Sequence, residues 1–89
     1  MRILCCGYRD WAKTIYKKLE DNFHEEHSFL HINSLNQCSR NLIKDFKPDL
    51  ILWYGWSWII PEDITKKYYC IMLHPSPLPK YRGGSPIQN

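Results

Sequence analysis

The chain consists of short, almost continuously apolar runs separated by segments with helical periodicity. The apolar runs at residues 2–6, 50–54 and 68–73 are predicted strands, and the more polar segment at residues 27–32 is predicted as another. Strands that lack alternation of polar and apolar residues are typical of a parallel sheet covered on both faces. Strand–helix–strand units form right-handed crossovers, so their strands run parallel. The sequence therefore predicts an α/β fold with a mostly parallel sheet.

Two helices are predicted between the first three strands. The first begins at Asp10, whose carboxylate can cap it, and runs to about Asn22. Its apolar residues recur every four positions and share one face: Trp11, Ile15 and Leu19. The second helix begins at Ser34 or Asn36 and ends before Pro48. This order of elements predicts a Rossmann-like unit of three layers, with helices on both faces of the sheet.

The chain is short for a complete unit of this kind. Its 89 residues are fewer than the about 100–150 residues that a doubly wound domain usually needs to cover both sheet faces. We therefore expect residues 1–89 to form a single, incomplete domain, which a complementing C-terminal portion would complete. The turn after the first strand holds Gly7 without the G-x-G-x-x-G fingerprint, so no pyrophosphate site is predicted there.

Charge, hydropathy and residue spacing bear on whether the chain binds nucleic acid, membranes or metal ions. The net charge of +3 is small and dispersed, which argues against a nucleic-acid partner. No apolar run approaches the ~20 residues of a membrane helix. Arg9 and Asp10 follow the N-terminal apolar run closely, so a cytoplasmic protein without a membrane partner is expected. The cysteines at 5, 6, 38 and 70 and the histidines at 24, 27 and 31 lack the spacing of metal ligands, so no metal site is predicted.

One histidine stands where the fourth apolar run ends. His74 is followed by prolines at alternate positions, Pro75, Pro77 and Pro79, which stiffen an extended segment. Ligands of α/β proteins bind at the carboxyl ends of the strands, so a functional role for His74 is as well supported as a structural one. The P-x-x-P spacing of proline-recognition ligands is absent from this run, which argues against that role.

The run H-P-S-P-L-P-K-Y-R-G-G-S-P-I-Q at residues 74–88 resembles the signature loop of the folate-dependent formyltransferases. That family includes methionyl-tRNA formyltransferase and the nucleotide-sugar N-formyltransferases. The resemblance implies transfer of a formyl group from the co-substrate 10-formyltetrahydrofolate to an amine, with His74 as proton acceptor and oxyanion partner. The Trp-Ser-Trp sequence at 56–58 and Pro75 are closer to the sugar enzymes, so the resemblance favours a nucleotide-linked amino sugar as acceptor.

The resemblance also implies which residues hold the two substrates. Two segments would frame the folate: Gly55, Trp56, Ser57, Trp58, Ile59, Ile60 and Pro61, and then Ser76, Pro77, Leu78 and Pro79. Lys80 and Arg82 would meet an anionic acceptor, and Tyr8 and Arg9 lie in a loop that is near the acceptor in the family. From the residues alone, the two tryptophans fit core packing equally well, and the two cations fit a solvated loop.

Departures from the family pattern bear on activity. In the family, an Asn two positions before the His faces the formyl group together with it. This chain has Met72 at the position of that Asn, and a thioether cannot donate a hydrogen bond to an oxyanion. Strand alternation puts Tyr68, Cys70, Met72 and His74 on one face. The downstream Asp of the family has no counterpart after His74. Two alternatives to a sugar enzyme therefore stay open: a relative of methionyl-tRNA formyltransferase, and a non-catalytic remnant or interaction fragment.

Overall fold

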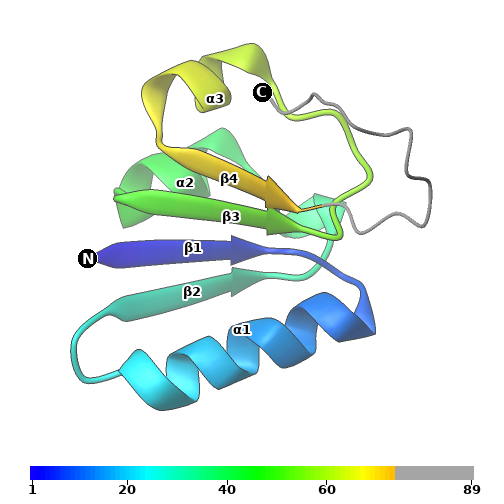
Figure 1. The fold of residues 1–89 in the computed structure, drawn as a ribbon. Helices are drawn as coiled ribbons and strands as arrows, with labels where there is room; N and C mark the ends of the chain where they lie inside the picture. Colours follow the sequence, from blue (N-terminus) through cyan, green and yellow to red (C-terminus); the bar gives the residue numbers. More distant parts are fainter. Residues whose placement is uncertain (74–89) are drawn as a thin grey trace.

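The computed structural model describes residues 1–73 of the chain (Figure 1). Its helices and strands, in chain order, are β1 (Arg2–Cys6), α1 (Asp10–Phe23), β2 (Ser28–Ile32), the 3-10 helix η1 (Leu35–Gln37), α2 (Arg40–Phe46), β3 (Leu50–Tyr54), α3 (Glu62–Lys67) and β4 (Cys70–Leu73). The four strands form one sheet in the order β2-β1-β3-β4, and each neighbouring pair is parallel. The predicted α/β fold with its parallel sheet is confirmed.

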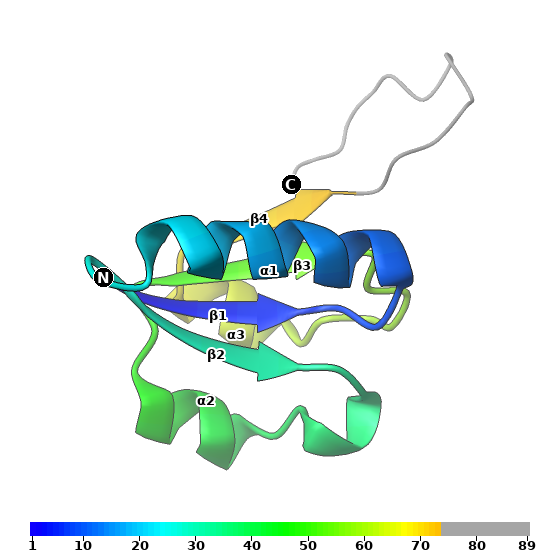
Figure 2. The ribbon, with the colours of Figure 1, turned by 90° about the horizontal axis from the view of Figure 1, so that it is seen from below.

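Each face of the sheet has its own apolar cluster. Alternate residues of β1 divide between them: Leu4 and Cys6 join one cluster, whereas Ile3 and Cys5 join the other. The first cluster also holds Ile43 of α2 and Ile64 of α3, and the second packs against α1. Figure 2 shows α1 and α2 on opposite sides of the sheet. The predicted three layers are therefore present, and both faces of the central strands are dry.

The start and the buried face of α1 differ from the sequence prediction. Arg9 is the N-cap residue and makes no side-chain cap, whereas Asp10 lies inside the first turn. There its carboxylate interacts favourably with the helix dipole instead of capping a backbone N–H. The fully buried residues of α1 are Ala12 and Tyr16, and the predicted apolar positions flank them half-buried. Ala12 lets the helix approach the sheet, because its side chain is small.

The second helical segment is divided in two. After η1 the chain passes through Cys38, and Ser39 then caps α2 by accepting a hydrogen bond at its Oγ from the Leu42 N–H, at 3.0 Å. The predicted start at Ser34 or Asn36 corresponds only to η1. Lys47 ends α2 in the left-handed conformation, with φ of 53°, directly before Pro48. A helix commonly stops at such a residue, because the following proline cannot continue it.

The order of the strands creates a topological switch point between β1 and β3. From β1 the chain crosses by α1 to β2 on one side, and it then returns by α2 to β3 on the other side of β1. The connections that leave β1 and β3 therefore run to opposite faces of the sheet, α1 to one face and α3 to the other. Open α/β sheets bind their ligands at the carboxyl ends of the strands, at such a switch point.

Candidate functional site

Three parts of the chain meet at the carboxyl edge of the sheet, where the arrowheads of all four strands point (Figure 1). These are the loop after β1, the loop after β3 and the end of β4. Tyr54 pairs with Leu73 in the parallel register of β3 and β4. The Gly55 N–H extends this pairing by donating a hydrogen bond to the Leu73 carbonyl at 3.2 Å. The start of the Gly55–Pro61 segment is thereby joined to the last residue of β4.

Gly55 turns the chain away from β3. Its φ of 69° lies in the left-handed region, which glycine adopts without steric cost. A Cβ at this position would lie 3.0 Å from Arg9 Cγ and 3.1 Å from Trp11 Cζ2. The glycine therefore serves two purposes, a sharp exit from the strand and close contact with the loop after β1.

The two tryptophans of the segment have different environments. Trp56 is buried in the core, at 2% exposure, and its ring packs edge-on against Trp53 at 5.4 Å between centroids. Trp58 packs against Trp56 at 4.9 Å and against the Tyr8 ring at 4.7 Å, yet it remains 37% exposed. Trp56 is thus a core residue that supports the loop, whereas Trp58 keeps a face open to solvent. Ile59 is 94% exposed beyond it.

Polar contacts join the loops after β1 and β3. The hydroxyls of Tyr8 and Ser57 are hydrogen-bonded at 2.5 Å, and the Arg9 guanidinium donates to Ser57 Oγ at 3.4 Å. The Arg9 guanidinium carbon also lies 5.1 Å from the centre of the Tyr8 ring, a cation–π arrangement. An exposed positive charge, that of Arg9, therefore lies beside the half-buried ring of Tyr8 at this edge.

Tyr16, a residue that the sequence pattern did not single out, lies below these loops. Its hydroxyl is 2.7 Å from the Cys6 carbonyl and 3.0 Å from the Leu52 carbonyl, and it accepts a hydrogen bond from the Tyr54 N–H at 2.8 Å. Burial raises the pKa of the Tyr16 hydroxyl above its usual range, so the group stays protonated and can donate. The available signal was a tyrosine four residues after Ala12, on the helix face that turns to the sheet.

A groove of about 330 Å³ opens between α2, the Gly55–Pro61 segment and α3. Its walls include Trp56, Ile59, Ile60 and Pro61, together with residues of α2. The volume is at the lower end of the about 300–1,000 Å³ typical of small-molecule sites. The groove brings together four of the seven residues of this segment that were predicted to bind a cofactor.

An ion pair ties α2 to α3 beside this groove. Arg40 donates from Nε to Asp63 Oδ2 at 2.9 Å and from a terminal nitrogen to Oδ1 at 3.1 Å, so the pair is bidentate. The hydrogen bond from Arg40 holds the pKa of Asp63 below its usual range. Asp63 is therefore charged at neutral pH, and the contribution of the pair is lost only as the pH falls through that lowered pKa.

The other predicted site residues lie outside the described part of the chain. These are His74, Ser76, Pro77, Leu78, Pro79, Lys80 and Arg82. Met72, which stands at the position of the family Asn, is in β4 and is 46% exposed. Tyr68 and Cys70 pack on the same apolar cluster as Trp56. The predicted strand from Tyr68 is shorter in the structure, because Tyr68 is the C-cap residue of α3 and β4 begins at Cys70.

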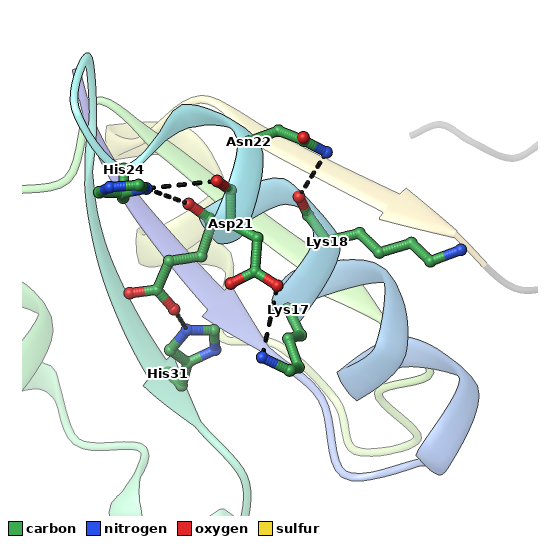
Figure 3. Close-up of polar contacts among 7 residues, drawn as sticks. Lys17, Lys18, Asp21, Asn22, His24 and His31 are labelled. Carbon is green, nitrogen blue, oxygen red and sulfur yellow. Dashed lines mark hydrogen bonds and ion pairs between the residues drawn. The ribbon is translucent and has the colours of Figure 1, made fainter.

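His24 and His31 contact different atoms of α1 residues (Figure 3). His31 Nε2 is 2.7 Å from a carboxylate oxygen of Glu20, and His24 Nδ1 contacts the carbonyls of Glu20 and Asp21. His27 Nδ1 is 2.9 Å from the N-terminal nitrogen. Within residues 1–73, no three His, Cys, Asp or Glu side chains gather in a way that could hold a metal ion.

All four cysteines are free thiols, and they differ in burial. Cys5 and Cys6 are buried, whereas Cys38 and Cys70 are half-buried. Burial raises the pKa of the Cys5 thiol to about 12 and raises that of Cys6 as well. Since the thiolate is the reactive form, Cys5 in the folded protein should react on the order of 10³-fold more slowly at pH 8 than an ordinary cysteine.

We expect a thiol reagent at pH 8 to modify Cys38 and Cys70 of the native protein and all four cysteines after denaturation. Mass spectrometry of the modified peptides measures this. Because the Cys5 pKa is raised, its neutral form contributes stability that is present below the pKa of an unfolded thiol, about 8.5. That contribution is lost as the pH rises toward 12, so alkaline unfolding should expose all four thiols together. Rapid modification of Cys5 in the native state would contradict the assignment.

Comparison with known proteins supplies the family. The parallel sheet with helices on both faces and loops gathered at its carboxyl edge defines the doubly wound α/β class, whose members bind ligands at the carboxyl ends of the strands. Residues 22–89 match the family model described as Formyl transferase. The chain belongs to the formyl transferase family, as its signature loop predicts.

The relatives and the structural neighbour carry one name. Methionyl-tRNA formyltransferase of Rickettsia bellii is 42% identical over 55 residues, covering 60% of this chain and 18% of that protein. The Orientia tsutsugamushi protein of the same name is 53% identical over 51 residues, which cover 55% of this chain and 17% of that protein. The structure of methionyl-tRNA formyltransferase from Clostridium thermocellum matches with a TM-score of 0.77 and 25% identity, over 89% of this chain and 35% of that chain. The chain thus spans less than a fifth of these two sequence relatives.

The sequence-based argument against a nucleic-acid partner is wrong. The relatives are methionyl-tRNA formyltransferases by name, so their substrate is a nucleic acid. A net charge of +3 on a chain that spans 18% of such a protein does not report the charge of the whole surface that meets a tRNA. Of the described helices, none has the length and apolar character needed to cross a membrane.

Proposed function

We propose that residues 1–89 are part of a cytoplasmic enzyme domain that transfers the formyl group of 10-formyltetrahydrofolate to an amine. The observation that carries this proposal is the hydrogen bond from the Gly55 N–H to the Leu73 carbonyl at 3.2 Å. It joins the tryptophan-containing segment to the strand from which the chain enters His74. Membership of the formyl transferase family supports the reaction class.

The reaction needs one base and stabilisation of one oxyanion. The amine nitrogen attacks the formyl carbon, and a new carbon–nitrogen bond forms in a tetrahedral oxyanion. The oxyanion then collapses and breaks the bond from the formyl carbon to N10, so that tetrahydrofolate leaves. We assign His74 as the base that takes the proton of the amine, as a donor to the oxyanion in its protonated form, and as the acid that passes the proton to N10 as the bond to the formyl carbon breaks.

The folate would lie against the segment Gly55–Pro61, with Ser76–Pro79 on its other side. The groove beside Trp56, Ile60 and Pro61 supports this assignment, because flat heterocycles bind in apolar clefts with few polar groups. The exposed face of Trp58 supports it further. Trp56 acts from within the core by holding the loop in position.

The acceptor that the comparisons favour is an aminoacylated tRNA, because the relatives carry the name methionyl-tRNA formyltransferase. Lys80 and Arg82, together with the exposed Arg9, are assigned to its phosphates, which cations of this kind bind. The Trp-Ser-Trp sequence at 56–58 favours a second candidate, a nucleotide-linked amino sugar. Both acceptors present an amine and a phosphate, so the reaction itself is the same.

Binding of 5-formyltetrahydrofolate, which carries a formyl group on a folate, tests the proposal. Titration of the chain should change its tryptophan fluorescence in a saturable way. The variant Trp58→Ala should weaken this binding on the order of 10-fold, as expected for loss of an aromatic contact worth about 1–1.5 kcal/mol. Lys18→Ala, on the solvent side of α1, is the matched control and should bind as the natural chain does. A fluorescence response that never saturates would refute the folate assignment.

Formyl transfer with each acceptor separates the two candidates. Methionyl-tRNA and a nucleotide-linked amino sugar are supplied in parallel with 10-formyltetrahydrofolate, and the formylated product is quantified. We expect the larger kcat/KM with methionyl-tRNA. A larger kcat/KM with the amino sugar would favour the nucleotide-linked amino sugar as the acceptor. Absence of formylated product with both acceptors would count against catalysis by this chain.

A further inference from the structure

The hydroxyl of Tyr16 is inserted between the carboxyl ends of β1 and β3. It accepts the Tyr54 N–H at 2.8 Å and lies 2.7 Å from the Cys6 carbonyl. The Leu52 carbonyl at 3.0 Å is a second acceptor for its single proton. A side chain of α1 therefore bridges backbone groups of the two strands at their ends.

The bridge stands at the topological switch point. The β1–β3 pairing extends to Cys6 and Trp53, and the next backbone donor of β3, the Tyr54 N–H, is bound by the hydroxyl. One residue further along each strand the chain departs into the loops that hold Tyr8 and Trp56. The position of the hydroxyl therefore sets the distance between the first residues of the loop after β1 and of the loop after β3.

The ring of Tyr16 leaves the hydroxyl little freedom. The residue is 1% exposed, and its ring stacks on the Tyr54 ring with centroids 5.3 Å apart. On another side, the His31 ring meets it edge-on at 6.2 Å. Because the ring is packed on both sides, it cannot shift relative to its neighbours. The position of α1 therefore determines where the hydroxyl lies between the ends of β1 and β3.

We infer that Tyr16 is a positioning residue for the proposed substrate site: its hydroxyl holds the ends of β1 and β3 at a fixed separation, and through them the Tyr8–Ser57 contact. This inference rests on the proposed function, because the loop after β1 and the Gly55–Pro61 segment are where we assign the acceptor and the folate. Tyr16 touches neither substrate and acts through the backbone of Cys6 and Tyr54.

The variant Tyr16→Phe tests this role, because it keeps the ring and removes the hydroxyl. Two measurements are made on the full chain at a temperature where circular dichroism shows it folded. The first is NMR of the chain without ligand, recording hydrogen exchange at the Tyr54 amide and the indole N–H signals of Trp56 and Trp58. The second is the affinity for 5-formyltetrahydrofolate.

In the phenylalanine variant, we expect exchange at the Tyr54 amide to rise on the order of 10-fold above any global change. The indole signals of Trp56 and Trp58 should shift, and affinity should fall about 10-fold in the folded protein. The control Ile3→Val alters the same apolar cluster at the opposite end of β1. It should change exchange uniformly and leave the indole signals and the affinity as they were.

Unchanged indole signals together with unchanged affinity in Tyr16→Phe would overturn the inference, since the hydroxyl would then serve stability alone. A uniform rise in exchange like that of Ile3→Val would overturn it as well. If the natural chain itself shows no affinity for the folate, the proposed function fails. The NMR comparison then still decides whether Tyr16 sets the position of the loops.

Discussion

Replacement of Met72 by asparagine is expected to raise the rate of formyl transfer by on the order of 10²–10³-fold. A side-chain amide can donate a hydrogen bond to the oxyanion, and a thioether cannot. Met72 is 46% exposed in β4, so a polar side chain is accommodated there, with a change in stability within about 0.5 kcal/mol. Single-turnover assays with a radiolabelled formyl donor and methionyl-tRNA measure the effect.

Two further variants show whether the amide itself is responsible. Met72→Leu keeps a side chain of similar volume without a donor and should leave the rate unchanged. The double variant Met72→Asn, His74→Ala should lose the gain and a further factor of about 10²–10⁴, the usual contribution of a general base. An equal gain from Met72→Leu would show that volume, rather than hydrogen bonding, limits the natural chain.

The variant Gly7→Ala is expected to lower the free energy of unfolding by about 3 kcal/mol or more. A Cβ at Gly7 would lie 2.3 Å from the carbonyl oxygen of Tyr54, which is backbone of the neighbouring strand. It would also lie 3.2 Å from Tyr16 Cε2 and 3.3 Å from the Ala12 Cβ. Neither strand nor helix can move away alone, so β1, β3 and α1 must separate. Thermal unfolding followed by circular dichroism should show a midpoint lowered by at least about 12 °C.

Gly55 provides the matched comparison, because its requirement for glycine is of a different kind. At Gly55 the added Cβ meets Arg9 and Trp11 side-chain atoms at 3.0–3.3 Å, and the Arg9 side chain can move. The cost of Gly55→Ala is then mainly that of holding a left-handed φ of 69°, about 1–2 kcal/mol. Gly55→Asn should cost less, because asparagine tolerates this region. An equal loss in Gly7→Ala and Gly55→Ala would contradict the backbone clash at Gly7.

Local patterns in the chain were sufficient for the fold. The apolar runs predicted strands at 2–6 and 50–54, and β1 and β3 occupy these residues. They succeed because a strand buried on both faces must be apolar throughout, whatever its neighbours are. Ser39 was missed as a cap because Ser34 and Asn36 offer the same chemistry nearby. Only the packing of Ile43 and Ile64 against the sheet selects the serine from which the helix starts.

The site was predictable in part. The resemblance of residues 74–88 to the formyltransferase loop indicated the family, and the family model bears this out. The argument from charge against a nucleic-acid partner failed, because the net charge of a chain that spans 18% of a relative does not give the charge of that relative's whole surface. The two tryptophans at 56 and 58 could not be told apart by composition, since both are costly to expose. Contact with Trp53 and Tyr8 decided that one is core and the other half open.

The amino-acid sequence was enough to predict the α/β fold class, its parallel sheet and the family, because these depend on hydrophobic pattern and on a contiguous motif. Only the tertiary structure decided that Tyr16 joins β1 to β3 and that the Gly55 N–H meets the end of β4. Hydrophobic periodicity tells which side chains leave water, but it carries no information about which buried groups become partners. Those partnerships arise when segments distant in sequence pack together, and in this protein they join the strand ends and loops at the carboxyl edge of the sheet.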